Sequence, residues 1–172
     1  MNSEIAEDRR VNILDATPLL LKLIPPGRNI TCSHVIAEIK NTLAQAIVST
    51  HIECGNIKLE EPEDEDVKKV YTISELTGDY KNLSLADIHV IALAIKYTKE
   101  KYEVTVYTDD FSIQNIMKHL KIPFIHCIRE VKRPLKWVLK CRYCGKVYKF
   151  TYVGDRCEDC GGPLVRSPAK RH

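Results

Sequence analysis

The sequence predicts an α/β domain with a parallel β-sheet, followed by a small β-hairpin module that folds around a metal ion. Over roughly the first 130 residues, short apolar runs typical of buried strands alternate with amphipathic helical patterns. Two Cys-x-x-Cys pairs follow near the C-terminus. The charge also changes sign: residues 132–172 carry eleven basic and three acidic side chains, a net +8, whereas residues 1–131 carry 15 basic and 20 acidic, a net −5.

This division of charge favours a polyanionic partner held by the C-terminal part, although small basic tails also occur merely as solubilising segments. No apolar run approaches the roughly 18 residues of a membrane span, and the polar N-terminus lacks the pattern of a secretory signal. The chain has seven cysteines, an odd number, which favours a metal site in a reducing compartment over a disulfide framework. We therefore expect a cytoplasmic protein.

The first elements are expected within residues 11–59. Apolar runs mark the strands, and Pro18 suits the first turn of a short helix that Thr17 would cap. In order, we expect a strand at Val11–Asp15, a helix from Thr17 to Leu23, a longer helix that Ser33 caps and that stops at Cys54–Asn56, and a strand at Ile57–Leu59.

The remaining elements of the first domain are expected within residues 63–128. The acidic run Glu63–Asp66 suits the first turn of a helix, because acids there complement the helix dipole. Ser84 and Asp87 have the spacing of a capping box, with Asp in place of the usual Glu. In order, we expect a helix from the acidic run to Gly78, a helix from Ser84 through Ile95, a strand at Val104–Tyr107, a helix through Phe111–Leu120 and a strand at Ile122–Ile128.

Strands that alternate with helices predict parallel pairing through right-handed crossovers. Sites in such sheets form beyond the carboxyl ends of the strands. Asp15 lies at the carboxyl end of the first strand, and Asp109 and Asp110 follow the Val104–Tyr107 strand. We therefore expect these acids at the same edge of the sheet.

The two cysteine pairs predict a structural zinc site. The second pair begins after an interval of 12 residues, and a glycine follows each pair, where it lets the backbone turn tightly under the thiolates. Four thiolates suit tetrahedral Zn²⁺ with no open coordination position. A redox dithiol is the alternative, but one pair would suffice for that chemistry. The predicted ligands are Cys141, Cys144, Cys157 and Cys160.

Basic and aromatic residues surround the predicted zinc site. Lys146–Tyr152 alternates as a hairpin strand would, and we expect Tyr148 or Phe150 in the small core. Cations beside aromatic rings suit contacts with phosphates and stacked bases, although the aromatics also suit a core. The predicted RNA contacts are Lys136, Lys140, Arg142, Lys146, Lys149 and Arg156.

Acidic residues occupy distinctive places in the first domain: Asp15, Glu38, Asp87 and the Asp109–Asp110 pair. Singly, each has an ordinary interpretation as a helix cap or a solvated helix residue. Jointly, clustered carboxylates repel one another unless they share hard cations, and oxygen-only ligands select Mg²⁺ or Mn²⁺. Such ions orient a water and shield the charge that develops on a scissile phosphate. Six histidines, among them His34 and His89, have no paired spacing and are expected in surface or core roles.

The order and context of these acids resemble the PIN-domain nuclease family. The matching segments are Ile13–Asp15, Glu38 in a helix, Ala86–Ile88 and, most specifically, the octapeptide Thr108–Asn115. A PIN domain followed by a four-cysteine ribbon is similar to the Nob family of small-subunit rRNA maturation nucleases in its short archaeal form. The resemblance implies a three-layer α/β/α fold and Mn²⁺ or Mg²⁺ at the four acidic places. Which of Asp109 and Asp110 is the ligand stays open, with the spacing favouring Asp110.

The resemblance also implies the activity: metal-dependent cleavage of precursor small-subunit rRNA near its mature 3′ end, on the pre-ribosomal small subunit and with its assembly factors. The alternatives are a non-catalytic RNA-binding assembly factor and a toxin-type PIN ribonuclease. We also expect two neighbours of the acids to affect their position: Thr108 could hold a carboxylate by a hydrogen bond, and Ser84 could orient Asp87 or merely cap its helix. The expected division of the chain is a nuclease domain at 1–130, a linker at 131–137, a zinc ribbon at 138–166 and a basic disordered tail at 167–172.

Overall fold

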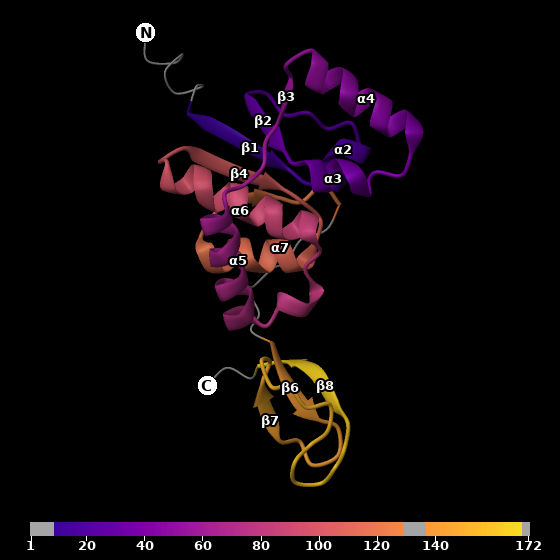
Figure 1. Ribbon diagram of the computed structural model, residues 1–172, viewed down its shortest axis with the longest axis vertical. Coiled ribbons are helices and arrows are strands. Elements are labelled where there is room, and N and C mark those ends of the chain that lie inside the picture. The colour runs from indigo at the N-terminus through magenta and orange to yellow at the C-terminus, as the bar shows by residue number, and fades with distance from the viewer. Residues whose placement is uncertain (1–8, 129–136, 170–172) are drawn as a thin grey trace.

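The computed structural model describes residues 9–128 and 137–169 and contains two separate sheets. The first is five-stranded and parallel, with the strand order β3-β2-β1-β4-β5. The second is three-stranded and antiparallel, with the order β7-β6-β8. The predicted parallel α/β domain with a separate cysteine-bearing β module is therefore confirmed (Figure 1).

The elements of the parallel domain occupy residues 10–125. Its strands are β1 (Arg10–Leu14), β2 (Arg28–Thr31), β3 (Ile57–Leu59), β4 (Glu103–Tyr107) and β5 (Phe124–Ile125). Its helices are α2 (Ala16–Leu20), α3 (Ser33–Glu38), α4 (Thr42–Glu53), α5 (Asp64–Thr77), the 3₁₀ turn η1 (Tyr80–Asn82), α6 (Leu85–Lys99) and α7 (Phe111–Leu120).

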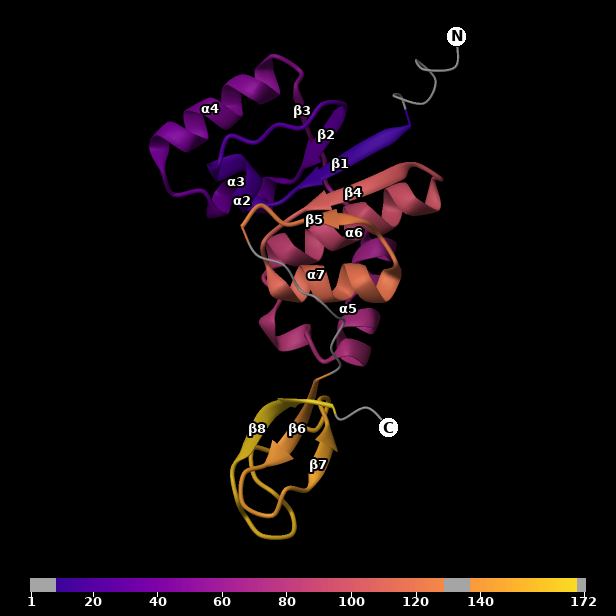
Figure 2. The same cartoon turned by 180° about the vertical axis from the view of Figure 1, so that it is seen from behind.

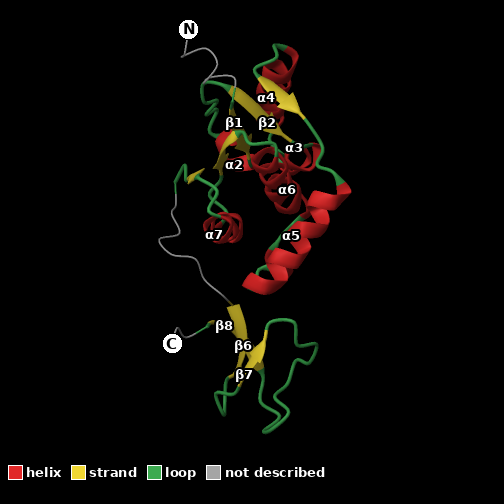
Figure 3. Ribbon diagram, turned by 90° about the vertical axis from the view of Figure 1, so that its left-hand side faces the viewer, coloured by secondary structure: helices red, strands yellow, loops and turns green. Residues whose placement is uncertain are grey.

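The sheet lies between two layers of helices. α4 covers one side, and α5, α6 and α7 cover the other (Figures 2 and 3). α6 is apolar on nearly every side, because it packs against the sheet, against α3 and against α5 and α7 at once. Its buried residues join those of β1 and β4 in one core. Within the described residues, no helix is long and apolar enough to cross a membrane.

The long helix predicted from Ser33 is wrong in one respect: the structure contains two helices there. Ile39 has an extended backbone (φ −76°, ψ 98°) that ends α3, with Cys32 rather than Ser33 as its N-cap residue. The Asn41 side chain then accepts a hydrogen bond from Ala44 N and begins α4. Apolar residues on both helices preserve the helical period across the break, which is why periodicity alone does not reveal it.

Three other elements differ from expectation. α2 is capped by Asp15, not by Thr17, and its helix ends at Leu20. β2 was not predicted, because its sequence Arg-Asn-Ile-Thr holds three polar residues; Asn29 is nevertheless buried, donating to three backbone carbonyls. β5 is only two residues long, and it begins directly after Pro123, whose nitrogen has no proton to donate to the ladder.

The C-terminal sheet consists of β6 (Trp137–Cys141), β7 (Val147–Lys149) and β8 (Leu164–Pro168). The expected hairpin is therefore extended by a third strand. β8 pairs with β6 up to the Trp137–Pro168 register, so Ser167 and Pro168 are strand rather than tail, and Trp137 belongs to the ribbon rather than the linker. The remainder of the expected linker, with Lys136, and the last three residues of the expected tail lie outside the described residues.

Candidate active site

Asp15 is fixed where β1 ends. Its Oδ1 accepts a hydrogen bond from Ala16 N at 2.7 Å, which caps α2. Its Oδ2 accepts one from the Thr108 hydroxyl at 2.6 Å. Thr108 in turn accepts from Asp110 N at 3.0 Å, so one buried hydroxyl joins two of the acids. The expectation that Thr108 holds a carboxylate is met by this geometry.

Asp87 stands in the first turn of α6, in a complete capping box. Its Oδ2 accepts from Ser84 N at 2.7 Å, and Ser84 Oγ accepts from Asp87 N at 3.1 Å. Ser84 therefore caps the helix, and its backbone amide orients the carboxylate.

The Asp109–Asp110 pair lies between β4 and α7. Asp110 Oδ1 accepts from Ser112 N and Ile113 N, and so caps α7. Asp109 Oδ1 accepts from Ile128 N at 2.7 Å. Glu38, the last residue of α3, is exposed. Three of the four acidic positions, Asp15, Asp87 and Asp110, are therefore helix caps or capping partners. This agrees with the ordinary interpretation of each acid taken singly.

All five acids line one cleft of about 440 Å³. The structure brings together residues that are up to 95 positions apart in the chain, at the carboxyl ends of β1 and β4. The remaining lining residues are Ala16, Thr17 and Ile128. The acids are spread around the cleft: among described residues, they do not form a group whose ligand atoms all lie within 4.8 Å of one another.

The cleft is electrostatically strained. Burial raises the pKa of Asp15, with the charges of Asp110 and Glu38 acting in the same direction. Burial likewise raises the pKa of Asp87 to about 7, reinforced by Asp110 and Asp15. Hydrogen bonds from Thr108 and Ser84 oppose these shifts without cancelling them. A divalent cation held by oxygen ligands would relieve this repulsion, so the donor set fits a hard metal ion.

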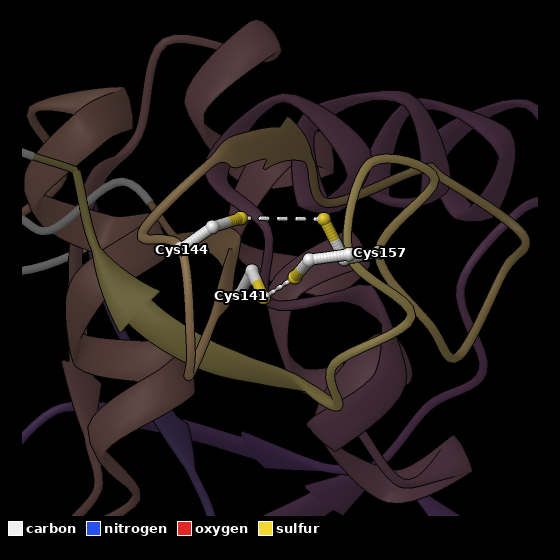
Figure 4. Close-up of side chains that lie close together, drawn as sticks. Cys141, Cys144 and Cys157 are labelled. Carbon is white, nitrogen blue, oxygen red and sulfur yellow. Dashed lines mark hydrogen bonds between the residues drawn. The ribbon is translucent and has the colours of Figure 1, made fainter.

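The second candidate site is the cysteine cluster, whose four sulfur atoms lie within 4.8 Å of one another. Figure 4 shows the sulfurs of the three labelled cysteines pointing toward a common centre. Two sulfur–sulfur distances, Cys141 to Cys160 and Cys144 to Cys157, are 3.4 and 3.5 Å. The edge of a tetrahedral zinc–thiolate site is about 3.8 Å, so the cluster fits a metal ion of this kind after a small expansion.

Hydrogen bonds favour the thiolate form of two of these cysteines, Cys141 and Cys157. Tyr143 N donates to Cys141 Sγ at 3.4 Å, and the Tyr148 hydroxyl lies 3.1 Å from Cys157 Sγ. The Tyr148 contact is the main cause that lowers the pKa of Cys157 to about 6. Both aromatics expected as core candidates, Tyr148 and Phe150, are buried.

The basic residues expected to contact RNA lie on the ribbon surface where they are described. Arg142, Lys146, Lys149 and Arg156 are exposed and Lys140 is half-buried, whereas Lys136 lies outside the described residues. Lys146 forms an ion pair with Asp159 at 2.7 Å. Sequence reasoning missed one cluster altogether: His34, Glu61 and His89 meet near the start of α3. Their spacing along the chain gives no local signal of that contact.

Comparison with known proteins identifies relatives of both parts of the chain. A family described as the PIN domain of ribonuclease matches residues 12–97. "Endoribonuclease Nob1" of Methanothermobacter thermautotrophicus is 35% identical over 162 residues, covering 93% of this chain and 92% of the relative. "Ribonuclease VapC1" of Thermoplasma acidophilum is 33% identical over 81% of this chain and 68% of its own length. "20S-pre-rRNA D-site endonuclease NOB1" of Saccharomyces cerevisiae is 37% identical over 89 residues, 49% of this chain and 19% of the relative.

Proposed function

We propose, because this chain belongs to the Nob1 family of PIN-domain endoribonucleases, that it cuts precursor small-subunit rRNA near the mature 3′ end. The chain is a nuclease of the metal-dependent PIN type, as the resemblance in its sequence implied. The observation that carries the proposal is the single cleft that collects Asp15, Glu38, Asp87, Asp109 and Asp110. The yeast relative, whose name specifies a site in 20S pre-rRNA, supports the choice of substrate.

In the proposed mechanism, the carboxylates would hold Mn²⁺ or Mg²⁺ next to the scissile phosphate and its attacking water. When bound, the ion would lower the pKa of that water and shield the negative charge of the phosphate. Asp15 and Asp110 are kept in place by the hydroxyl and amide groups around Thr108, and Asp87 by the first turn of α6. Glu38, exposed at the end of α3, is the acid most open to the incoming RNA.

The cysteine ribbon is proposed to bind Zn²⁺ and to hold the RNA backbone. Arg142, Lys149 and Arg156 are exposed there, and Tyr143 is 75% exposed, which leaves its ring open for base stacking. Lys136, Lys140 and Lys146 complete the proposed contacts. The partners follow from the substrate: the pre-ribosomal small subunit and its assembly factors, in the cytoplasm.

The test is to map the ends of a precursor RNA that spans the 3′ end of the small-subunit rRNA, cut by the full chain with added Mn²⁺. The Asp15→Asn variant removes one charge from the cleft and keeps the shape of the side chain. We expect cleavage at the mature end to slow by at least about 100-fold. Glu53→Gln, which changes an exposed acid outside the cleft, is the matched control and is expected to cleave at the normal rate.

Metal dependence is tested by withholding Mn²⁺ and Mg²⁺ rather than by adding a chelator, because a chelator also removes an ion from the cysteines. Equal cleavage by Asp15→Asn and the unchanged chain would refute the assignment of the active site. Tight RNA binding with no cut ends on several precursors would favour a non-catalytic assembly factor. Cleavage confined to other RNAs, with release of inhibition from a small partner protein, would favour the alternative of a toxin-type PIN ribonuclease.

A further inference from the structure

A second cluster of potential metal ligands lies outside both sites described above. His34 comes from the first turn of α3, Glu61 follows β3, and His89 lies on α6. One ligand atom from each lies within 4.8 Å of the other two. None of the three residues lines the acidic cleft.

The distances within this cluster match those of a coordination site. Glu61 Oε2 is 3.0 Å from His89 Nδ1 and 4.0 Å from His34 Nδ1. Ligands at zinc bond lengths of roughly 2.1 Å are about 3.4 Å apart in a tetrahedron, which falls between these two values. The two imidazole rings lie side by side, with centroids 4.2 Å apart. Small ring movements would therefore bring three donors around one ion.

The hydrogen bonds within this cluster do not satisfy all of its buried polar atoms. Nδ1 of His34 is shielded from solvent and has no hydrogen-bond partner within the described part of the chain. A buried nitrogen without a partner is costly, and coordination would satisfy it. Glu61 Oε1 accepts from Ser33 N at 2.9 Å, which holds the carboxylate in place and leaves Oε2 directed at the histidines.

We propose that His34, Glu61 and His89 bind a borderline divalent transition-metal ion, Zn²⁺ being the best match. Two imidazoles and one carboxylate form a donor set that suits zinc, whereas Mg²⁺ and Mn²⁺ prefer oxygen ligands only. Glu61 is 48% exposed, so a water completes the tetrahedron. The site is distinct from the four cysteines and from the acidic cleft, and it does not depend on the proposed rRNA substrate.

An ion at this position would link two helices that carry acids of the cleft. α3 carries Glu38 and α6 carries Asp87, so a metal bridge from His34 to His89 would tie together the helices that support two acids of the cleft. Glu61 adds the segment that leads into α5. Loading this site is therefore expected to stiffen the side of the cleft formed by α3 and α6.

The test measures zinc content and Co²⁺ spectra of the full, untagged chain. After equilibrium dialysis against buffered free Zn²⁺, we expect about two zinc ions per chain, and about one in His34→Ala and in His89→Ala. Co²⁺ titration is expected to give one strong sulfur charge-transfer signal from the cysteines, then a second equivalent with weak ligand-field bands and no added sulfur signal. Only the second equivalent should disappear in the histidine variants.

Three further variants test whether the second ion depends on these three side chains. Glu61→Gln keeps an oxygen for the Ser33 amide but loses the anionic ligand, so we expect it to lose the second zinc while remaining folded by circular dichroism. His126→Ala changes an exposed histidine outside the cluster and is expected to retain both ions. The proposal is overturned if the unchanged chain binds only one zinc, or if Asp15→Asn rather than the histidine variants removes the second.

Discussion

Single residues in the acidic cleft perform two tasks at once. Asp15 and Asp110 cap α2 and α7, and Asp87 closes the capping box of α6, yet all three also line the cleft. Capping explains how like charges remain close together. Backbone amides at helix N-termini offset part of the repulsion among them and fix the direction of each carboxylate. The capping and metal-binding interpretations of these acids are therefore compatible.

Asp87 gives a pH-dependent prediction, because its folded-state pKa is raised from 3.8 to about 7, chiefly by burial. An acid with a raised folded pKa binds more protons in the folded than in the unfolded state between those two values. Folding stability from this group is therefore lost as the pH rises from about 4 to about 7. Asp87→Asn lacks that loss and keeps an oxygen for the Ser84 amide.

We accordingly expect Asp87→Asn, without added Mn²⁺ or Mg²⁺, to be more stable than the unchanged chain by about 1 kcal/mol at pH 8 and to show little difference at pH 4. Urea unfolding at the two pH values measures this, with zinc left on the cysteines. Added Mn²⁺ should stabilise the unchanged chain at pH 8 more than the variant. If Asp87→Asn is less stable than the unchanged chain at pH 8, then burial and the neighbouring acids do not disfavour the ionised Asp87 carboxylate.

At the level of elements, the break between α3 and α4 places Glu38 on the cleft. α3 ends at Glu38, and the chain turns through Ile39 before Asn41 begins α4. Without this break, α3 and α4 would form one straight helix, and Glu38 would lie inside it rather than at the end of α3. The cap at Asn41 therefore stabilises the start of the second helix after this break.

We predict that Asn41→Ala lowers the free energy of unfolding by about 1 kcal/mol, because the Ala44 amide loses its acceptor. Asn41→Asp is the matched control, since its carboxylate accepts the same bond. Chemical denaturation of both variants measures the difference. If alanine and aspartate at this position give equal stabilities, the side chain contributes nothing to the start of α4.

At the scale of the whole molecule, the ribbon contacts the nuclease domain through a small set of buried and half-buried residues. Arg166 on β8 donates to Asp79 Oδ1 at 2.8 Å, and Asn115 on α7 donates to Asp79 Oδ2 at 2.7 Å. The Arg166 guanidinium also lies 3.8 Å over the Trp137 ring. Gly78, with φ +79°, ends α5 directly against Trp137.

We predict that Gly78→Ala separates the ribbon from the nuclease domain as well as destabilising the chain. A Cβ at this position would lie 2.6 Å from Trp137 Cβ, a contact that requires movement. The positive φ adds about 1–2 kcal/mol of strain. Gly55→Ala is the matched control, since φ is +75° there and nothing lies within 4 Å of the added carbon.

Small-angle X-ray scattering and thermal unfolding distinguish the two effects. Both variants should lose stability through backbone strain, but only Gly78→Ala should increase the radius of gyration. An unchanged scattering profile for Gly78→Ala would mean that the contact between Gly78 and Trp137 does not hold the two parts together.

Features that depend on neighbouring residues could be predicted from the sequence. The apolar runs located β1 and β4, the capping signals at Gly78 and Ser84 bounded α5 and α6, and the spacing of the four cysteines indicated their cluster. β2 and the break at Ile39 could not be predicted in this way, because buried asparagine and an uninterrupted helical period carry no local mark of a strand or of a helix end.

Contacts between side chains that are distant in the chain follow instead from the tertiary structure. Thr108 contacts Asp15 because β4 pairs with β1, and His34 reaches His89 because α3 packs on α6. The docking of Trp137 on Gly78 is a contact of the same kind. Periodicity and capping report interactions within a few residues, whereas these contacts depend on the strand order and helix packing that burial of the whole core selects.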